Sequence, residues 1–138
     1  MPLWTMNCHV VWATKRREPV LVGETAELVR RSLVDGCSKQ GIVLHALFLM
    51  PDHVHLAVSI PPGLAVATLV SRLKGSSSHL IRHAEPNPDP SFAWQSEYGV
   101  VAFGEKQLPD VVAYVENQPA RHKDRTTWSK LEQDCDNE

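Results

Sequence analysis

Two apolar runs separated by a Pro-Asp pair are the feature that most restricts the fold of this chain. Residues 42–50 read IVLHALFLM and residues 53–60 read HVHLAVSI, with Pro51 and Asp52 between them. Short runs rich in branched and aromatic residues favour β-strands, and Pro-Asp is a typical turn dipeptide. The sequence therefore predicts an antiparallel hairpin over residues 42–60.

The second strand of this hairpin has two chemically different faces, because side chains alternate along a strand. One face is wholly apolar and is expected to join the core; it carries Val54, Leu56, Val58 and Ile60. The other face carries His53, His55, Ala57 and Ser59.

His53 and His55 therefore point together, ~7 Å apart at Cα, and their ring nitrogens can reach one metal ion. Two partly exposed histidines on an open sheet face are the alternative. Two ligands do not complete a metal site, so a third must come from elsewhere. A histidine-triad nucleotide hydrolase would need a histidine where this chain has Ala57.

The other apolar patterns predict strands over residues 4–14 and 92–103 and helices over residues 24–40, 64–83 and 106–118. In the first helix the buried face is predicted to hold Ala26, Val29, Leu33 and Cys37, and Gly41 is predicted to end it. Gly75 and the serines after it could interrupt the second helix. The order β-α-β-β-α-β-α predicts an α+β fold, a central and mostly antiparallel sheet with flanking helices.

Length and composition indicate one cytoplasmic domain. The chain has 138 residues, and its last seven, 132–138, form an acidic tail with four acids and no base. Residues 1–131 form the domain and hold 14 Lys and Arg against 12 Asp and Glu. No apolar stretch approaches the ~20 residues that cross a bilayer, and the N-terminus lacks the features of a signal peptide. Three scattered cysteines, Cys8, Cys37 and Cys135, favour a reducing compartment.

Tyr114 and Gln118 lie four residues apart in the last predicted helix and share one helical face. Alone, the pair is explained by an ordinary amphipathic surface. Beside a two-histidine site, Gln118 could supply an amide oxygen as the third metal ligand. Tyr114 would then lie next to the metal, and a metal can stabilise attack by a phenol, whose pKa of ~10 otherwise makes it a poor nucleophile.

Five segments of the chain, in this order, resemble those of a known family. They are HVVWATKRREPVL at 9–21, PDHVHLAVS at 51–59, LKGSSS at 73–78, FAWQSEYG at 92–99 and YVENQPARH at 114–122. The family is the HUH single-tyrosine transposases of the smallest bacterial insertion sequences, the insertion sequence two-hundred type. HUH stands for histidine, bulky apolar residue, histidine. The resemblance extends across most of the chain.

The resemblance implies a fold similar to an RNA-recognition, or ferredoxin-like, domain. It implies that His53, His55 and Gln118 bind a divalent ion, Mg²⁺ or Mn²⁺, with Asp52 in a supporting role. Tyr114 is the implied nucleophile, and Tyr98 is implied to be structural. Tyr114 would attack a phosphodiester of single-stranded DNA at hairpin-bearing element ends, forming a 5′-phosphotyrosine and a free 3′-hydroxyl. A homodimer is implied, with Tyr114 acting in cis or in trans.

Basic side chains in these segments are candidate phosphate contacts. They are Lys15, Arg16, Arg17, Arg72, Lys74, Arg82, Arg121 and Lys123. Lys74 is favoured, because a glycine and three serines follow it and suit a phosphate. For most of the others a solvated surface charge is the simpler interpretation.

Two other functions stay open. One is a non-catalytic or domesticated nucleic-acid-binding relative that acts on palindromic repeats. The other is an unrelated metal hydrolase that uses water, which should tolerate Tyr114→Phe and leave no covalent DNA adduct.

Overall fold

The computed structural model describes residues 6–117. Its strands are β1 (Asn7–Ala13), β2 (Val43–Met50), β3 (His53–Ser59) and β4 (Gly99–Phe103). Its helices are α1 (Gly23–Lys39), α2 (Val66–Arg82) and α3 (Leu108–Glu116), with short 3₁₀ turns η1 (Lys15–Arg17) and η2 (Glu105–Gln107). The element order is the predicted one, and the acidic tail predicted at 132–138 lies outside the described residues.

The four strands form one antiparallel sheet in the order β2-β3-β1-β4. The hairpin predicted over residues 42–60 is present as β2 and β3, joined by the turn at Pro51 and Asp52. In the middle of the sheet, Val11 lies opposite His55 and His9 lies opposite Ala57. The predicted α+β fold is confirmed.

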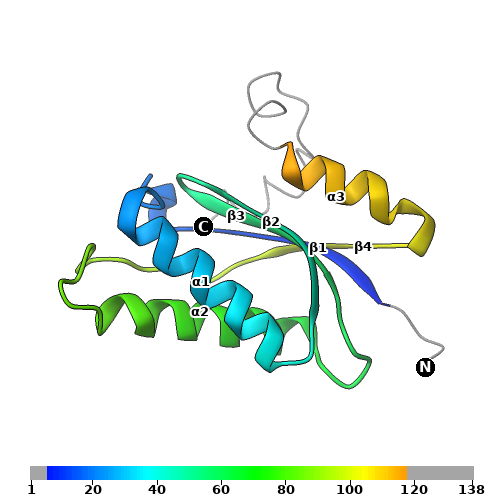
Figure 1. The fold of residues 1–138 in the computed structure, drawn as a ribbon, viewed down its shortest axis with the longest axis horizontal. Coiled ribbons are helices and arrows are strands. Elements are labelled where there is room, and N and C mark those ends of the chain that lie inside the picture. Colours follow the sequence, from blue (N-terminus) through cyan, green and yellow to red (C-terminus); the bar gives the residue numbers. More distant parts are fainter. Residues whose placement is uncertain (1–5, 118–138) are drawn as a thin grey trace.

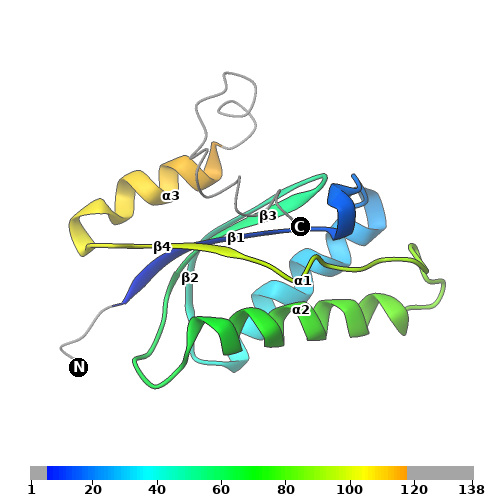
Figure 2. The ribbon, with the colours of Figure 1, turned by 180° about the vertical axis from the view of Figure 1, so that it is seen from behind.

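The sheet separates two layers of helices. Helices α1 and α2 cover one face, and α3 lies across the other (Figure 1, and from behind in Figure 2). The larger core lies under α1 and α2 and includes Trp12, Val29, Leu33, Leu56, Leu69 and Leu73. A smaller cluster under α3 holds Ala46, Ala57, Val111, Tyr114 and Val115.

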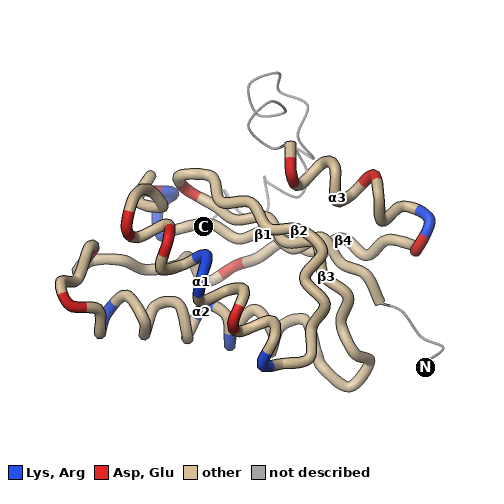
Figure 3. Tube along the Cα trace, in the orientation of Figure 1, with Lys and Arg blue, Asp and Glu red and all other residues tan. Residues whose placement is uncertain are grey.

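The strands carry no Lys, Arg, Asp or Glu, so the charged side chains of the described residues lie on helices and loops (Figure 3). Within residues 6–117, the helices are all too short or too polar to cross a bilayer.

Helices α1 and α2 follow their sequence patterns closely. Val29, Leu33 and Cys37 of α1 are buried as predicted, whereas Ala26 is only partly buried against the core. Gly41 follows the helix end with φ of +71°, a conformation that glycine adopts without strain. Helix α2 continues without a break through Gly75 and the serines. Ser77 Oγ donates to the carbonyl of Leu73 at 2.8 Å, which satisfies this hydroxyl inside the helix.

The strand predicted over residues 92–103 is wrong in its first half, because only Gly99–Phe103 forms a strand. The backbone of residues 92–98 pairs with the end of β1 at a single bridge, between Thr14 and Trp94, and the Trp94 ring packs edge-on against Trp12 of β1 with ring centroids 5.9 Å apart. Side chains of α2 hold this segment: Lys74 Nζ donates to the carbonyls of Gln95 (2.7 Å) and Glu97 (2.9 Å). Trp94 Nε1 donates to Ser77 Oγ at 2.9 Å. The carbonyls of residues 95 and 97 therefore bond to a side chain rather than to a neighbouring strand.

Candidate active site

The two histidines of β3 lie together on the sheet face that α3 covers. The exposed fractions of His53 and His55 are 2% and 0%, and their ring centroids are 4.9 Å apart with an interplanar angle of 66°. Their strand neighbours Val54 and Leu56 point into the larger core on the opposite face. The predicted division of β3 into an apolar face and a histidine face is confirmed, although both rings are buried.

Asp52 fixes one of these imidazoles. Its Oδ1 lies 2.6 Å from His53 Nδ1, and Arg17 Nε donates to its Oδ2 at 3.1 Å. Because a carboxylate only accepts hydrogen bonds, the proton of this bond belongs to His53 Nδ1. Burial raises the pKa of Asp52, but the hydrogen bonds from His53 and Arg17 outweigh that effect and lower it to about 2. The carboxylate is therefore charged at neutral pH.

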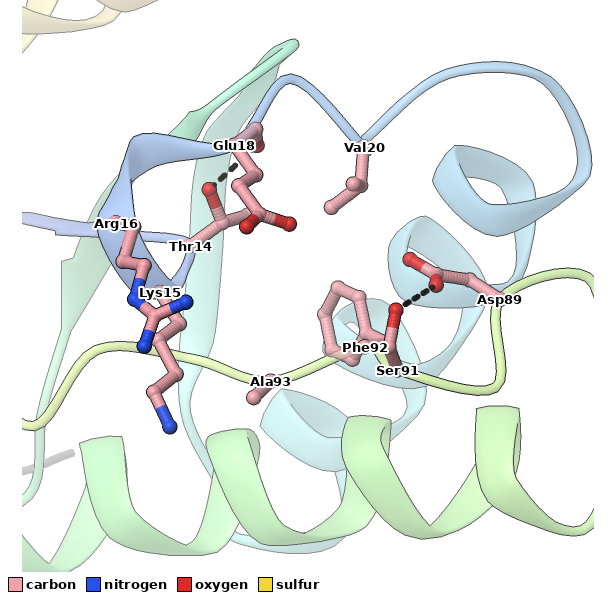
Figure 4. Close-up of a pocket in the computed structure, with 9 residues that line it drawn as sticks. All are labelled: Thr14, Lys15, Arg16, Glu18, Val20, Asp89, Ser91, Phe92 and Ala93. Carbon is pink, nitrogen blue, oxygen red and sulfur yellow. Dashed lines mark hydrogen bonds between the residues drawn. The ribbon is translucent and has the colours of Figure 1, made fainter.

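A strained turn brings Arg17 to this carboxylate. Arg16 and Arg17 have φ values of +58° and +52°, in the left-handed region that residues other than glycine rarely adopt. Thr14 Oγ1 closes the turn by donating to the carbonyl of Glu18 at 2.7 Å, a bond drawn in Figure 4. Strain of this kind persists where surrounding contacts hold it, as at functional sites. Arg17, predicted from sequence as a phosphate contact, thus lies within the histidine site.

His9 is the residue of this site that the sequence analysis missed. It is fully buried on β1, its Nε2 lies 3.0 Å from His55 Nδ1, and the two rings stack with centroids 5.2 Å apart. Alternation along the first strand places His9 on the face opposite Cys8 and Val10, and pairing of that strand with β3 would have brought it to His55. Strand order, which the pattern alone does not give, was the missing information.

Tyr114 faces the imidazoles from α3. It is 4% exposed, and its ring centroid lies 5.6 Å from that of His9 and 6.4 Å from that of His55. Val111 and Val115 flank it on the helix face that packs on the sheet. A hollow of about 300 Å³ opens beside Tyr114 between β4 and α3, lined also by Phe103, Gln107 and Asp110. The tyrosine thus has a buried ring that lines a hollow between the sheet and α3.

The histidine pair has the chemistry of two metal ligands. The hydrogen bonds described above engage Nδ1 on both rings, so Nε2 is the atom that each ring would offer to an ion. Within residues 6–117, no group of three or more His, Cys, Asp or Glu is placed to hold a metal ion. Gln118, the predicted third ligand, lies outside the described residues, as does Arg121.

The other basic candidates are distributed around the irregular segment 92–98. Residues 93–96 line a hollow of about 460 Å³ with Lys15 and Arg16, and another of about 490 Å³ with Lys74 and Arg82. Lys15 and Arg16 of η1 also line a further hollow, together with Phe92 and Ala93 (Figure 4). Arg72 lies apart and donates to Gln40 Oε1 at 3.3 Å.

Comparison with known proteins agrees with this geometry. The family model described as "Transposase IS200 like" matches residues 2–118. The chain belongs to the IS200-like transposase family. It is 30% identical to the ISDra2 transposase TnpA of Deinococcus radiodurans over 120 residues, which cover 84% of this chain and 86% of that protein. The family resemblance found in the sequence is therefore confirmed.

Other IS200-like relatives and solved structures are similar over different lengths. The transposase for insertion sequence element IS200 of Salmonella typhimurium is 30% identical over 78 residues, 56% of this chain and 51% of that protein. A crystal structure of a Deinococcus radiodurans R1 protein described as a transposase has a TM-score of 0.66 and 31% identity, over 85% of this chain and 93% of that one. A REP-associated tyrosine transposase bound to a REP hairpin also has a TM-score of 0.66. At 16% identity, over 88% of this chain and 73% of that one, it shows the fold alone.

Proposed function

We propose that this IS200-like transposase cleaves and rejoins single-stranded DNA through a covalent bond to Tyr114. The observation that carries the proposal is the position of this tyrosine. Its ring centroid lies 6.4 Å from that of His55, and its side chain lines a hollow. In the described part of the molecule, the histidine pair and the tyrosine come from different elements and converge on one face of the sheet.

In the proposed reaction the phenolic oxygen of Tyr114 attacks the phosphorus of a phosphodiester and loses its proton. The bond from phosphorus to the 3′ oxygen breaks, and that oxygen leaves as a 3′-hydroxyl after taking up a proton. The 5′ phosphate stays on the tyrosine. A 3′-hydroxyl later attacks this phosphotyrosine, which rejoins the strand and restores the phenol. The number of phosphoester bonds is unchanged, so no nucleotide hydrolysis is needed.

A divalent ion, Mg²⁺ or Mn²⁺, is the proposed cofactor. His53 and His55 would hold it through Nε2, and Gln118 would supply the third ligand. When bound, such an ion withdraws negative charge from the phosphate that the tyrosine attacks. Two imidazoles suit Mn²⁺ better than Mg²⁺, which prefers oxygen ligands.

Single-stranded DNA with a hairpin is the proposed substrate. Support comes from the solved neighbour bound to a REP hairpin and from the hollows around residues 93–96, where Lys15, Arg16, Lys74 and Arg82 gather. Because Lys74 already donates to two backbone carbonyls, Lys15 and Arg16 are the better candidates for phosphate contacts.

A homodimer is also proposed. Strand β4 lies at one edge of the sheet, and the exposed fractions of its Val100 and Val101 are 40% and 38%. An apolar edge strand of this kind is a surface on which a second copy can pair. Sedimentation equilibrium of the full chain should give twice the chain mass.

The deciding experiment is a covalent-trapping assay. The protein is mixed with Mn²⁺ and labelled single-stranded hairpins from the DNA that flanks its gene, and the products are run on a denaturing gel. A labelled protein band that disappears in Tyr114→Phe and persists in the matched control Tyr98→Phe is expected. Cleavage without a protein band would point to a water-using hydrolase. A shifted band on a native gel without cleavage would point to a DNA-binding relative.

A further inference from the structure

A third imidazole lies directly behind the histidine pair, and the proposed function leaves it without a role. His9 comes from the central strand β1, is fully buried, and places its Nε2 3.0 Å from Nδ1 of His55. Its other flank meets Tyr114 in an edge contact with ring centroids 5.6 Å apart and an interplanar angle of 70°. His9 therefore touches both a proposed metal ligand and the proposed nucleophile.

The hydrogen bond between the two imidazoles can run in either direction, and metal binding by His55 Nε2 requires one of them. A neutral imidazole carries one N–H and one acceptor nitrogen. If His9 Nε2 donated, His55 Nδ1 would be the acceptor and the proton of His55 would lie on Nε2, which could then not bind an ion. If His55 Nδ1 donates, its Nε2 keeps the lone pair that a metal needs. His9 must then carry its own proton on Nδ1.

We propose that His9 is a positioning residue that accepts the Nδ1 proton of His55 and so fixes the tautomer in which His55 Nε2 can bind the metal. The inference rests on the proposed function. Each of the two proposed metal ligands would then have an acceptor for its Nδ1 proton. Asp52 accepts that of His53 at 2.6 Å, and His9 accepts that of His55. Second-layer acceptors of this kind orient ligating histidines and fix their protonation.

The two acceptors differ in charge, and the surroundings give a reason. Asp52 is at the β2–β3 turn, where its side chain keeps 29% exposure and meets the Arg17 guanidinium. His9 is at 0% exposure, and its strand neighbours on this face are apolar: Ala57 lies opposite on β3 and Val101 opposite on β4. A carboxylate at position 9 would be a buried charge, which is costly unless a cation pairs with it. A neutral imidazole accepts the proton without that cost.

Two substitutions distinguish the effect of the hydrogen-bond acceptor on His9 from the effect of the size of its ring. His9→Gln keeps an acceptor in its amide oxygen, and His9→Phe keeps a ring against Tyr114 but cannot accept. His45→Phe is the matched control, because it removes an imidazole from the same sheet at a residue that bonds Ser59 instead. Thermal melts of the full chain establish that each variant is folded before it is compared.

The first measurement is two-bond ¹⁵N–¹H NMR of histidine-labelled protein at pH 8 without metal, which reports which nitrogen of His55 carries the proton. Wild type, His9→Gln and His45→Phe should show Nδ1–H on His55, and His9→Phe should lose this signature. The second is a Mn²⁺ titration followed by electron paramagnetic resonance. His9→Phe should bind Mn²⁺ ~10–100-fold more weakly than wild type, and the other two variants should stay close to wild type.

The outcomes separate this inference from the proposed function. An Nε2–H signature on His55 in wild type would overturn the role of His9, as would a His9→Phe variant with unchanged tautomer and unchanged Mn²⁺ affinity. Neither result would touch the tyrosine chemistry, which the covalent adduct reports. If wild type bound no Mn²⁺, the proposed metal site would fail, and the NMR signature would still decide whether His9 fixes the tautomer of His55.

Discussion

At the scale of single residues, the Asp52 carboxylate forms hydrogen bonds with both the Arg17 guanidinium and the His53 imidazole. It accepts from Arg17 and from His53, and both bonds are made by an ionised carboxylate. Asp52→Asn keeps the shape but removes the charge, so His53 becomes a weaker ligand. We expect Mn²⁺ affinity to fall ~10–100-fold in a Mn²⁺ titration. Asp35→Asn, which removes an exposed partner of Lys39, is the control and should bind like wild type. Equal affinity in both variants would mean that Asp52 does not act on the metal.

Cys37 gives a prediction on pH. Its side chain is 1% exposed in α1, and burial raises the pKa of its thiol from about 9 to about 11. Because the pKa of the folded state is the higher one, this contribution to stability is complete below about pH 9 and is lost as the pH rises through 11.

The free energy of unfolding of wild type, relative to Cys37→Ala, should therefore fall by about 1.4 kcal/mol per pH unit between these values. Urea unfolding of both proteins at pH 8, 9.5 and 10.5 measures this difference. A difference that stays constant over the series would show that the thiol titrates normally in the folded chain.

At the scale of elements, two helical glycines have opposite surroundings. A Cβ added at Gly75 in α2 would meet nothing within 4 Å, and one at Gly36 in α1 would lie 2.7 Å from Leu73 Cδ2. Gly75→Ala should raise the free energy of unfolding by about 0.5–1 kcal/mol, because alanine is the better helix former. Gly36→Ala should lower it, because Leu73 is 1% exposed and cannot shift without strain in the packed core. Urea unfolding of both variants tests the pair, and equal effects would contradict the close α1–α2 contact.

The elements also show how far sequence alone could predict this molecule. The β2–β3 hairpin was predictable because alternation and a Pro-Asp turn are local signals. Residues 92–98 were predicted as strand because their composition favours one, but bonds from Lys74 and Trp94 to distant partners decide their conformation. His53, His55 and Tyr114 could be named from sequence. Finding His9 required the strand order, and placing Arg17 beside Asp52 required the left-handed turn. Gln118 stays a prediction.

At the scale of the whole molecule, the two faces of the sheet are unequally anchored. Helices α1 and α2 pack on the larger core, which contains every buried leucine of residues 6–117. Helix α3 is held by a small cluster that includes Ala46, Ala57 and Val115. The helix that carries the proposed nucleophile thus has the smaller apolar contact. Regions with few buried apolar contacts open at lower free energy than the global unfolding.

Hydrogen exchange measured by mass spectrometry on the full chain tests this inequality. Val115→Ala, at a fully buried position on the sheet-facing side of α3, should accelerate exchange in residues 108–116 and leave α1, α2 and the strands protected. Leu33→Ala removes a fully buried side chain of the larger core and should cost about 2–5 kcal/mol, accelerating exchange throughout residues 6–117. If Val115→Ala accelerated exchange in α1 as much as in α3, the two layers would unfold as one unit. The tyrosine helix could then not move independently of the domain that holds the histidines.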